Sequence, residues 1–179
     1  MPQINKEDEF QKIFHRVLRF LSFRARSKKE ILDYLNKKKV GEKRKKQVLE
    51  KLKKINLLDD KEFVLWWVEQ RINFRPSGRR LLEQELRKKG VEREIIEETL
   101  EEIFKKEGKS REAIASRVYS SFEVELALRA AKKKFNRYKK LSPLEFRQKM
   151  AAFLSRRGFS WEVIKEIINK LTSKLASKS

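Results

Sequence analysis

The stretch LRKKGV at residues 86–91 recurs as LSRRGF at residues 154–159 and, less closely, as LNKKKV at residues 35–40. Each copy follows a helical pattern of apolar residues and contains basic side chains. In the copies at residues 86–91 and 154–159, the basic side chains are followed by Gly90 and Gly158. Glycine at this point is typical of a helix that ends in a left-handed turn. Repeated helix ends predict tandem helical units, which usually present an extended binding surface instead of an enclosed pocket.

The repeat continues beyond these stretches. Three apolar residues follow each glycine at the same offsets, namely Ile95, Ile96 and Leu100 in one copy and Val163, Ile164 and Ile168 in the other. Apolar residues at helical spacing fill most of the remaining sequence, and no convincing alternation of period two interrupts them. We therefore predict an all-α fold of nine helices, arranged as three tandem three-helix repeats in an elongated, curved array. The predicted boundaries are residues 8–56, 60–106 and 121–175, with residues 107–120 as a linker or a helical extension.

Helix starts are marked by capping boxes, in which a hydroxyl and a carboxylate three positions later satisfy opposing N–H groups. This spacing occurs in Ser27-x-x-Glu30, Ser120-x-x-Glu123 and Ser142-Pro143-x-Glu145. Pro143 fits the first helical position, where its missing N–H costs nothing. Asp60 is expected to cap the helix that carries the two adjacent tryptophans.

The first repeat departs from the other two. Lys39 stands where they have glycine, and because lysine adopts the left-handed conformation less readily, we expect a different turn that uses Gly41. Arg44 and Lys45 stand where the other copies have Ile95-Ile96 and Val163-Ile164. The pattern of apolar residues therefore does not predict that the third helix of this repeat packs like the third helices of the other two.

Positive charge dominates the composition. The chain has 47 Lys and Arg against 26 Asp and Glu, which gives a formal net charge of +21. A thermophile-like surface rich in Lys and Glu would explain the density of charge but not the imbalance. The excess predicts attraction to polyanions, with nucleic acid the first expectation, an acidic protein face the second and an anionic membrane the third.

Several functional classes are disfavoured. The chain contains no Cys, so it has no disulfide, thiolate nucleophile or thiolate metal site. Its longest apolar run, FVLWWV at residues 63–68, is too short to span a membrane, and the polar stretch MPQINKEDEF at the N-terminus is unlike a signal peptide. The single histidine, His15, lacks the partners of a metal ligand or general base. We expect a cytoplasmic protein that is not an enzyme and has no cofactor or metal site.

Three longer motifs occur in a fixed order: LLDD-x-x-F-x-x-x-WV from Leu57 to Val68, GRRL at residues 78–81, and FLSRRGFS-x-x-VI at residues 153–164. With the repeated stretch, they resemble the RecX family, bacterial regulators of the RecA recombinase, over about Phe14 to Leu171. The resemblance implies tandem three-helix repeats that bind along the groove of the RecA–single-stranded-DNA filament. It also implies restraint of filament growth, ATP hydrolysis, strand exchange and the coprotease activity of the SOS response, and hence a role in DNA repair and recombination. Intrinsic binding to single- and double-stranded DNA is implied too. We expect a monomer without membrane association.

Basic residues gather in runs, and we predict that these contact DNA or the filament. The predicted residues are Lys37, Lys38, Lys39, Lys43, Arg44, Lys45, Lys46, Arg75, Arg79, Arg80, Lys132, Lys133, Lys134, Arg137, Arg156 and Arg157. Cations near a helix C-terminus also interact favourably with the helix dipole, by about 0.3–1 kcal/mol each, which is an alternative explanation at residues 37–39 and 156–157. The dipole does not explain the run at residues 43–46, which begins a helix. Because phosphate contacts carry no base information, binding is expected to be independent of sequence. A stand-alone helical-repeat nucleic-acid-binding protein is the alternative function.

Trp66 and Trp67 are neighbours on one predicted helix, about 100° apart around its axis. The resemblance puts Trp67 at a core position and leaves Trp66 as the more exposed of the two. An exposed tryptophan can stack on nucleic-acid bases, but packing in the core and between repeats is the favoured explanation.

Overall fold

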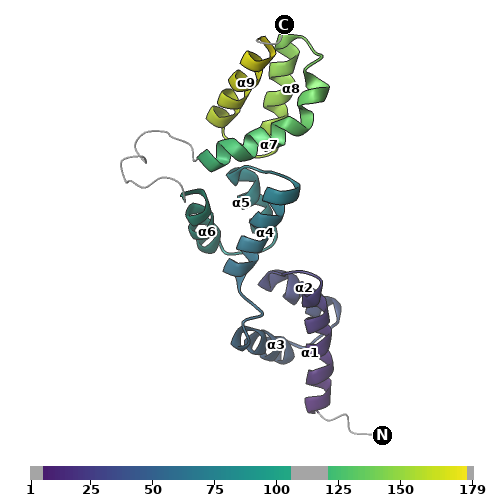
Figure 1. Cartoon of the computed structure of the whole chain (residues 1–179). Coiled ribbons are helices and arrows are strands. Elements are labelled where there is room, and N and C mark those ends of the chain that lie inside the picture. Colours follow the sequence, from purple (N-terminus) through teal and green to yellow (C-terminus); the bar gives the residue numbers. More distant parts are fainter. Residues whose placement is uncertain (1–5, 106–120, 177–179) are drawn as a thin grey trace. The chain divides into compact units, whose positions relative to one another are not determined.

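A computed structural model of the chain describes residues 6–105 and 121–176 (Figure 1). Within these ranges the regular structure is entirely α-helical and comprises nine helices, which confirms the predicted all-α fold. The helices are α1 (Lys6–Ser22), α2 (Lys28–Lys37), α3 (Glu42–Lys54), α4 (Asp60–Phe74), α5 (Arg79–Lys88), α6 (Arg93–Lys105), α7 (Ser121–Tyr138), α8 (Pro143–Arg156) and α9 (Trp161–Ala176). The predicted linker at residues 107–120 and the capping serine Ser120 lie outside the described residues.

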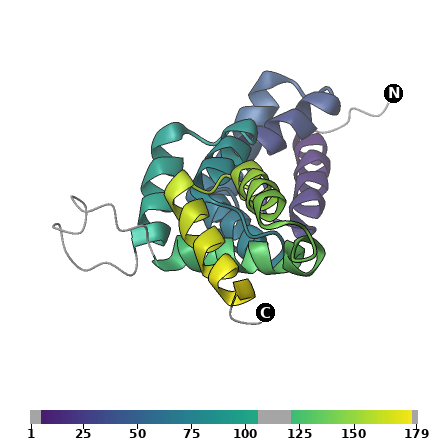
Figure 2. The same cartoon turned by 90° about the horizontal axis from the view of Figure 1, so that it is seen from above.

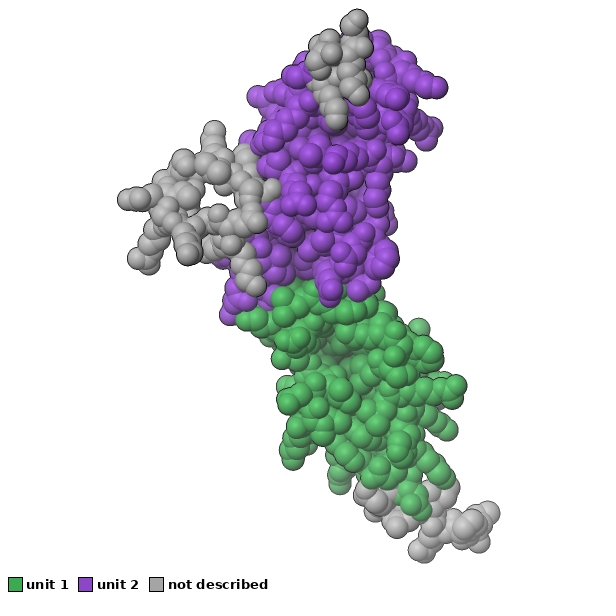
Figure 3. Space-filling model, viewed as in Figure 1, with its two compact units in different colours: residues 1–66, 86–96 green, residues 67–85, 97–179 purple. Residues whose placement is uncertain are grey.

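The chain divides into two compact units (Figure 3). Unit 1 contains residues 1–66 and 86–96, and unit 2 contains residues 67–85 and 97–179. In unit 1, α1 and α2 both contact α3, around a core that includes Phe14, Val17, Ile31, Leu35, Val48 and Leu52. In unit 2, α7, α8 and α9 contact one another pairwise (Figures 1 and 2), around buried side chains that include Leu126, Phe146, Met150, Leu154 and Ile167.

The same backbone turn ends the second helix of each repeat. In this turn an N–H donates to a carbonyl near the helix end, from Val40 to Leu35 (3.1 Å), from Val91 to Leu86 (3.3 Å) and from Phe159 to Leu154 (3.3 Å). The residue before each donor has a positive φ, of 55° at Lys39, 75° at Gly90 and 79° at Gly158. These features define the Schellman motif. The left-handed turns predicted at the two glycines are therefore confirmed.

The different turn expected at Lys39 is wrong. Lys39 adopts the left-handed conformation despite its side chain, whereas Gly41 has φ −68° and is the N-cap of α3. A non-glycine residue in this conformation costs about 1–2 kcal/mol. The turn is kept because the carbonyls at the end of α2 accept the N–H groups of Lys39 and Val40, at 2.9 Å and 3.1 Å.

Capping boxes begin α2 and α8 as predicted. In each, the serine side chain accepts the N–H of the glutamate, and that glutamate accepts the N–H of the serine, at Ser27–Glu30 and Ser142–Glu145. Pro143 occupies the first helical position of α8.

The cap expected at Asp60 is wrong by one residue. Asp59 caps α4 instead, because its Oδ1 accepts the N–H groups of Lys61 (2.7 Å) and Glu62 (3.4 Å). Asp60 is the first residue of α4, and its Oδ1 accepts the N–H of Lys28 (2.9 Å) at the start of α2.

The start of a second helix contacts the turn of the following repeat, and we call each such contact a repeat joint. In unit 1, Ser27 Oγ donates to the carbonyl of Lys89 (2.6 Å), and Lys89 Nζ pairs with Glu30 (2.9 Å). In unit 2, the N–H of Gly78 donates to the carbonyl of Arg157 (2.8 Å). Lys89 and Arg157 hold the same place in their repeats, one residue before the left-handed glycine. The two joints therefore use the backbone carbonyl of the equivalent residue as the acceptor.

Close approach at the repeat joints excludes side chains at the glycines. A Cβ on Gly90 would lie 2.3 Å from Lys29 Cδ, and a Cβ on Gly158 would lie 2.3 Å from the backbone nitrogen of Leu81. These separations are far shorter than van der Waals contact. Glycine is thus favoured at both turns by the packed neighbour as well as by the positive φ.

The third helix of the first repeat packs with a buried lysine. Lys45 is only 8% exposed and lies where the other repeats have Ile96 and Ile164, which are 1% and 2% exposed. Its Nζ bonds Glu42 Oε1 (2.6 Å), so the charge is paired while the aliphatic stem is buried. The polar substitution therefore does not prevent α3 from packing through the buried Val48 and Leu52.

Both tryptophans are half-buried, so the core position suggested for Trp67 is not found. Trp67 Nε1 donates to Glu85 (3.0 Å), and the Arg71 guanidinium lies 4.4 Å from the ring centroid. The Arg24 guanidinium lies 5.7 Å from the ring centroid of Trp66. Each indole is therefore associated with an arginine.

Candidate functional site

Cationic side chains gather around the segment that joins α4 to α5 in unit 2. Lys133 Nζ donates to the carbonyl of Phe74 (3.0 Å), and Arg157 Nη1 donates to the carbonyl of Pro76 (3.3 Å). Arg75 lies between these two carbonyls in the sequence and is exposed. Hydrogen bonds to two backbone carbonyls therefore hold Lys133 of α7 and Arg157, which follows α8, against one short segment.

These cations interact with one another unfavourably. The pKa of Arg157 is lowered from its ordinary value, first because the guanidinium is partly buried and then because Arg75 and Arg71 lie nearby. The ring of Phe153 lies 5.2 Å from the Arg157 guanidinium and 6.0 Å from Lys134 Nζ. Attraction of both cations to this ring partly offsets the unfavourable interaction between positive charges. An anion would relieve it further, because opposite charge favours the protonated form of each group.

A groove between α5 and α8 adds two more arginines. It has a volume of about 440 Å³ and is lined by Arg80, Leu81, Gln84, Ser155, Arg156 and Gly158. Arg80 and Arg156 are both exposed. We call these two arginines together with Arg75, Lys133, Lys134 and Arg157 the unit 2 basic surface.

The remaining predicted residues of unit 2 are placed differently. Arg79 is held by Glu83 in an ion pair of 2.9 Å along α5. Lys132 and Arg137 are exposed on α7, where Lys132 precedes Lys133 in the chain. The unit 2 basic surface therefore brings together six of the predicted cations, drawn from α5, α7, α8 and the adjoining loops.

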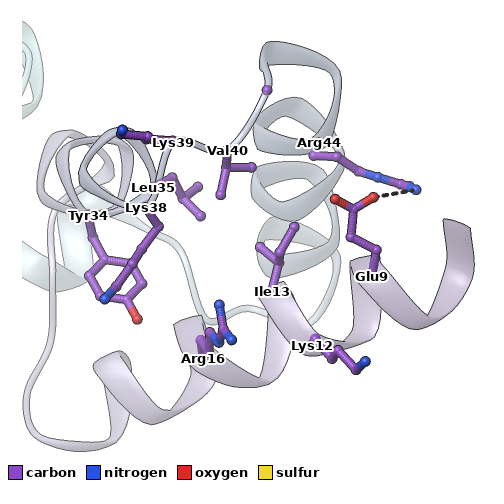
Figure 4. Close-up of a pocket in the computed structure, with 11 residues that line it drawn as sticks. Glu9, Lys12, Ile13, Arg16, Tyr34, Leu35, Lys38, Lys39, Val40 and Arg44 are labelled. Atoms are coloured by element: carbon purple, nitrogen blue, oxygen red, sulfur yellow. Dashed lines mark ion pairs between the residues drawn. The ribbon is translucent and has the colours of Figure 1, made fainter. Parts of the chain in front are cut away.

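Unit 1 has a basic pocket of about 290 Å³ between α1, α2 and α3 (Figure 4). Of the predicted residues, Lys38, Lys39 and Arg44 line it. Sequence reasoning missed Lys12 and Arg16, which line the pocket from α1. They do not form a run in the sequence, and the signal that could have found them is their spacing of one helical turn.

The other predicted cations of unit 1 lie outside this pocket. Lys37, Lys43 and Lys46 are exposed, whereas Lys45 is buried and paired with Glu42. The structure therefore separates the run at residues 43–46 into exposed, pocket-lining and buried members. Lys45 is the least accessible of the four to a ligand.

Searches of the described residues find neither a cluster of metal-ligating side chains nor a helix that could span a membrane. Among the described residues, no group of three or more His, Cys, Asp or Glu side chains could hold a metal ion. Over the same residues, no helix combines the length and apolar character that crossing a membrane requires. What both regions offer is ammonium and guanidinium groups, which bind phosphates and carboxylates.

Comparison with known families matches three domains in order along the chain. The first three-helix domain of RecX matches residues 14–52, the second matches residues 59–100 and the third matches residues 122–168. The first and third matched segments fall inside the predicted repeats 8–56 and 121–175, and the second begins one residue before the predicted repeat 60–106. The repeat boundaries themselves stay predictions.

Whole-chain relatives have the same family name. The regulatory protein RecX of Bacillus licheniformis is 35% identical over 90% of this chain and 56% of its own length. The regulatory protein RecX of Geobacillus sp. is 30% identical over 94% of this chain and 78% of its own length. The crystal structure of RecX from Lactobacillus salivarius superposes with a TM-score of 0.73 at 26% identity, covering 93% of this chain and 98% of that one. The chain thus spans little more than half the length of the Bacillus licheniformis relative.

Proposed function

Since the chain belongs to the RecX family of regulatory proteins, we propose that it regulates a RecA recombinase by binding the filament that RecA forms on single-stranded DNA. Family membership is the single observation that carries this proposal. We further propose that the effect is mainly inhibitory, restraining filament growth, ATP hydrolysis, strand exchange and SOS coprotease activity.

We assign contact with DNA to the unit 2 basic surface. Its members include Arg75, Arg80 and Arg156, which are exposed and available to phosphates. The nearness of Arg75 to Arg157, whose side chain is held on the carbonyl of Pro76 (3.3 Å), supports an anionic ligand there, because a phosphate would offset the repulsion between the two guanidinium groups. Such contacts position a protein on nucleic acid without reading its sequence, as a protein that acts on a filament of any sequence requires.

The proposed mechanism needs no covalent chemistry. A chain of three-helix repeats that contacts successive RecA protomers would hinder the rearrangements that accompany ATP hydrolysis and strand exchange. Cationic residues would bind DNA phosphates and acidic patches of the recombinase, while apolar side chains hold the repeats together. Capping of the growing filament end would also restrain growth. Whether preformed filaments are inhibited distinguishes capping from contact along the filament.

The alternative function is a stand-alone nucleic-acid-binding protein. The net charge of +21 favours it independently of family membership, since such an excess attracts any nucleic acid. The alternative predicts that DNA binding is unchanged by recombinase and that recombinase activity is unaffected.

The deciding experiment measures RecA ATP hydrolysis on single-stranded DNA while this protein is titrated. We expect hydrolysis to fall, and we expect Arg80→Glu with Arg156→Glu to weaken both inhibition and DNA binding at least five-fold. Lys149→Glu with Lys165→Glu is the matched control, because these two exposed lysines carry the same charge change outside the unit 2 basic surface. If saturating wild-type protein binds DNA but leaves RecA ATP hydrolysis unchanged, the result would support the alternative function instead.

A further inference from the structure

The basic pocket of unit 1 combines a cationic rim with an aliphatic floor. Figure 4 shows Ile13, Leu35 and Val40 at the centre of the lining, with basic side chains around them. Leu35 is 1% exposed and belongs to the core of unit 1, and both Ile13 and Val40 pack against that core. The floor is therefore a fixed part of the fold and not a mobile flap.

The rim is almost entirely positive. Lys12, Arg16, Lys38 and Lys39 are exposed, and none of the four takes part in the ion pairs found among the described residues. The one acidic member of the lining is Glu9, whose Oε2 lies 3.8 Å from Arg44 Nη2 (Figure 4). Four exposed cations around a small concavity favour an anionic ligand.

The aromatic ring in the lining is already stacked on another ring of unit 1. Tyr34 is stacked on Phe20, with ring centroids 4.4 Å apart and planes 9° apart. Lys38 Nζ lies 5.9 Å from the Tyr34 ring centroid. Binding of single-stranded nucleic acid relies on open aromatic faces for successive bases, whereas this lining has a single aromatic residue, Tyr34, which is already stacked on Phe20. An aliphatic floor instead suits a leucine or phenylalanine side chain.

We propose that this pocket binds an acidic peptide segment that carries a hydrophobic anchor residue, and so serves as a contact for a partner protein. The anchor would lie against the half-buried Ile13 and Val40, above the buried Leu35, and flanking carboxylates would pair with Arg16 and Lys38. Arginine and lysine clusters recognise acidic motifs in this way, and a buried apolar anchor dominates such interfaces. The inference deepens the proposed function, on which it rests for the existence of a protein partner, by separating protein recognition in unit 1 from DNA contact in unit 2.

Fluorescence anisotropy with two labelled peptides tests the proposal. The first probe is Glu-Asp-Glu-Leu-Phe-Asp-Glu-Glu, and the second replaces its Leu and Phe by Ser, so that charge is equal and only the anchor differs. We expect the first peptide to bind at least five-fold more tightly at physiological salt. Equal affinities would overturn the proposal, because they would mean that net charge alone attracts both peptides.

Matched variants locate the binding site. Arg16→Gln with Lys38→Gln should weaken the first peptide at least five-fold, whereas Arg80→Gln with Arg156→Gln should leave it unchanged. A labelled oligothymidylate should show the opposite dependence. All four side chains are exposed, so unchanged thermal unfolding is expected to confirm that every variant is folded. If the pocket variant weakens oligothymidylate as much as peptide, the pocket is a nucleic-acid site and the proposal is wrong.

The two proposals fail in different measurements. Peptide binding without any effect on RecA hydrolysis would contradict the proposed function and leave the peptide site supported. Inhibition of RecA hydrolysis without anchor-dependent peptide binding would contradict the peptide site and leave the proposed function supported.

Discussion

At the scale of single residues, the three equivalent turns differ in what lies against them. Gly90 and Gly158 are packed by the helix start of the preceding repeat, which leaves less than 3 Å for a Cβ. Lys39 has the same left-handed backbone and an exposed side chain. Two constraints, the positive φ and the packed neighbour, therefore favour glycine at residues 90 and 158. Only the positive φ favours glycine at residue 39. The weaker constraint at the third turn is the reason that lysine is tolerated there.

Substitution at these turns should have unequal costs. We expect Gly158→Ala to destabilise the protein by about 2–4 kcal/mol, because left-handed strain adds to a clash with the Leu81 backbone. Lys39→Gly should change stability by less than about 1 kcal/mol, since relief of strain is offset by greater freedom of the unfolded chain. Urea unfolding followed by circular dichroism measures both. Equal effects of the two substitutions would refute the role given to the repeat joint.

Thr99 is a buried residue whose hydroxyl has no hydrogen-bond partner among the residues that the structure describes. Its side chain is fully buried, and the equivalent positions of the other repeats hold the fully buried Val48 and Ile167. We expect Thr99→Val to raise the free energy of unfolding by about 1 kcal/mol, because it removes an unsatisfied polar group at nearly constant shape. Thermal unfolding with Thr99→Ser as a control, which keeps the hydroxyl and loses a methyl group, measures the effect. A loss of stability in the valine variant would show that the hydroxyl has a partner.

At the scale of helices, local signals were predictable from sequence and tertiary contacts were not. The capping boxes at Ser27 and Ser142 depend on residues three positions apart, so the pattern contains all the information needed. The cap of α4 was misplaced because two aspartates are adjacent, and Asp60 is used by the distant N–H of Lys28. Likewise, Arg16 joins the basic pocket only because α1 packs beside α2 and α3.

One helix start depends on a charge network and should therefore be sensitive to acid. Burial alone would raise the pKa of Glu30, but hydrogen bonds and charges from Arg24 and Lys89 outweigh burial and lower the pKa to about 2 from its ordinary 4.5. Because the folded pKa is depressed, the stabilisation is present above pH 4.5 and is lost as the pH falls from about 4.5 towards 2.

The test compares wild type with Glu30→Gln across that interval. In this interval the wild type binds one additional proton on unfolding, so its free energy of unfolding should fall by about 1.4 kcal/mol for each pH unit of acidification. The variant should lack this dependence. We expect the variant to be less stable at neutral pH by about 1–3 kcal/mol and to approach wild type near pH 2. Chemical unfolding at several pH values measures the difference. A constant difference at every pH would contradict the assigned pKa.

At the scale of the whole molecule, charge is concentrated in separate regions of the two units. Net charge of +21 predicted a polyanionic partner, and the run-based candidates Arg75, Arg80, Lys133, Arg156 and Arg157 are brought together in unit 2. The sequence could not reveal this grouping, since residues 75 and 157 meet only through the packing of the α5 start on the α8 turn. Nor could it show that one lysine of the run at residues 43–46 is buried.

Salt dependence tests whether the unit 2 basic surface contacts phosphates. Each phosphate contact on single-stranded DNA contributes about −0.7 to the slope of log affinity against log salt concentration. We expect Arg80→Gln with Arg156→Gln to make the slope shallower by about 1.4, whereas Lys149→Gln with Lys165→Gln should leave the slope unchanged. Anisotropy titrations from low to physiological salt measure it. Parallel slopes in wild type and the arginine variant would exclude these residues from phosphate contact.

The repeat joint has a consequence for building longer proteins from such modules. Each joint needs only a backbone carbonyl, a helix start and bare backbone at the left-handed residue, so it makes little demand on the rest of either module. At the equivalent turn after α2, Lys39 carries the Cβ for which a packed helix start leaves no room at Gly90 and Gly158. An engineer who wishes to attach another module at that turn must first replace lysine with glycine.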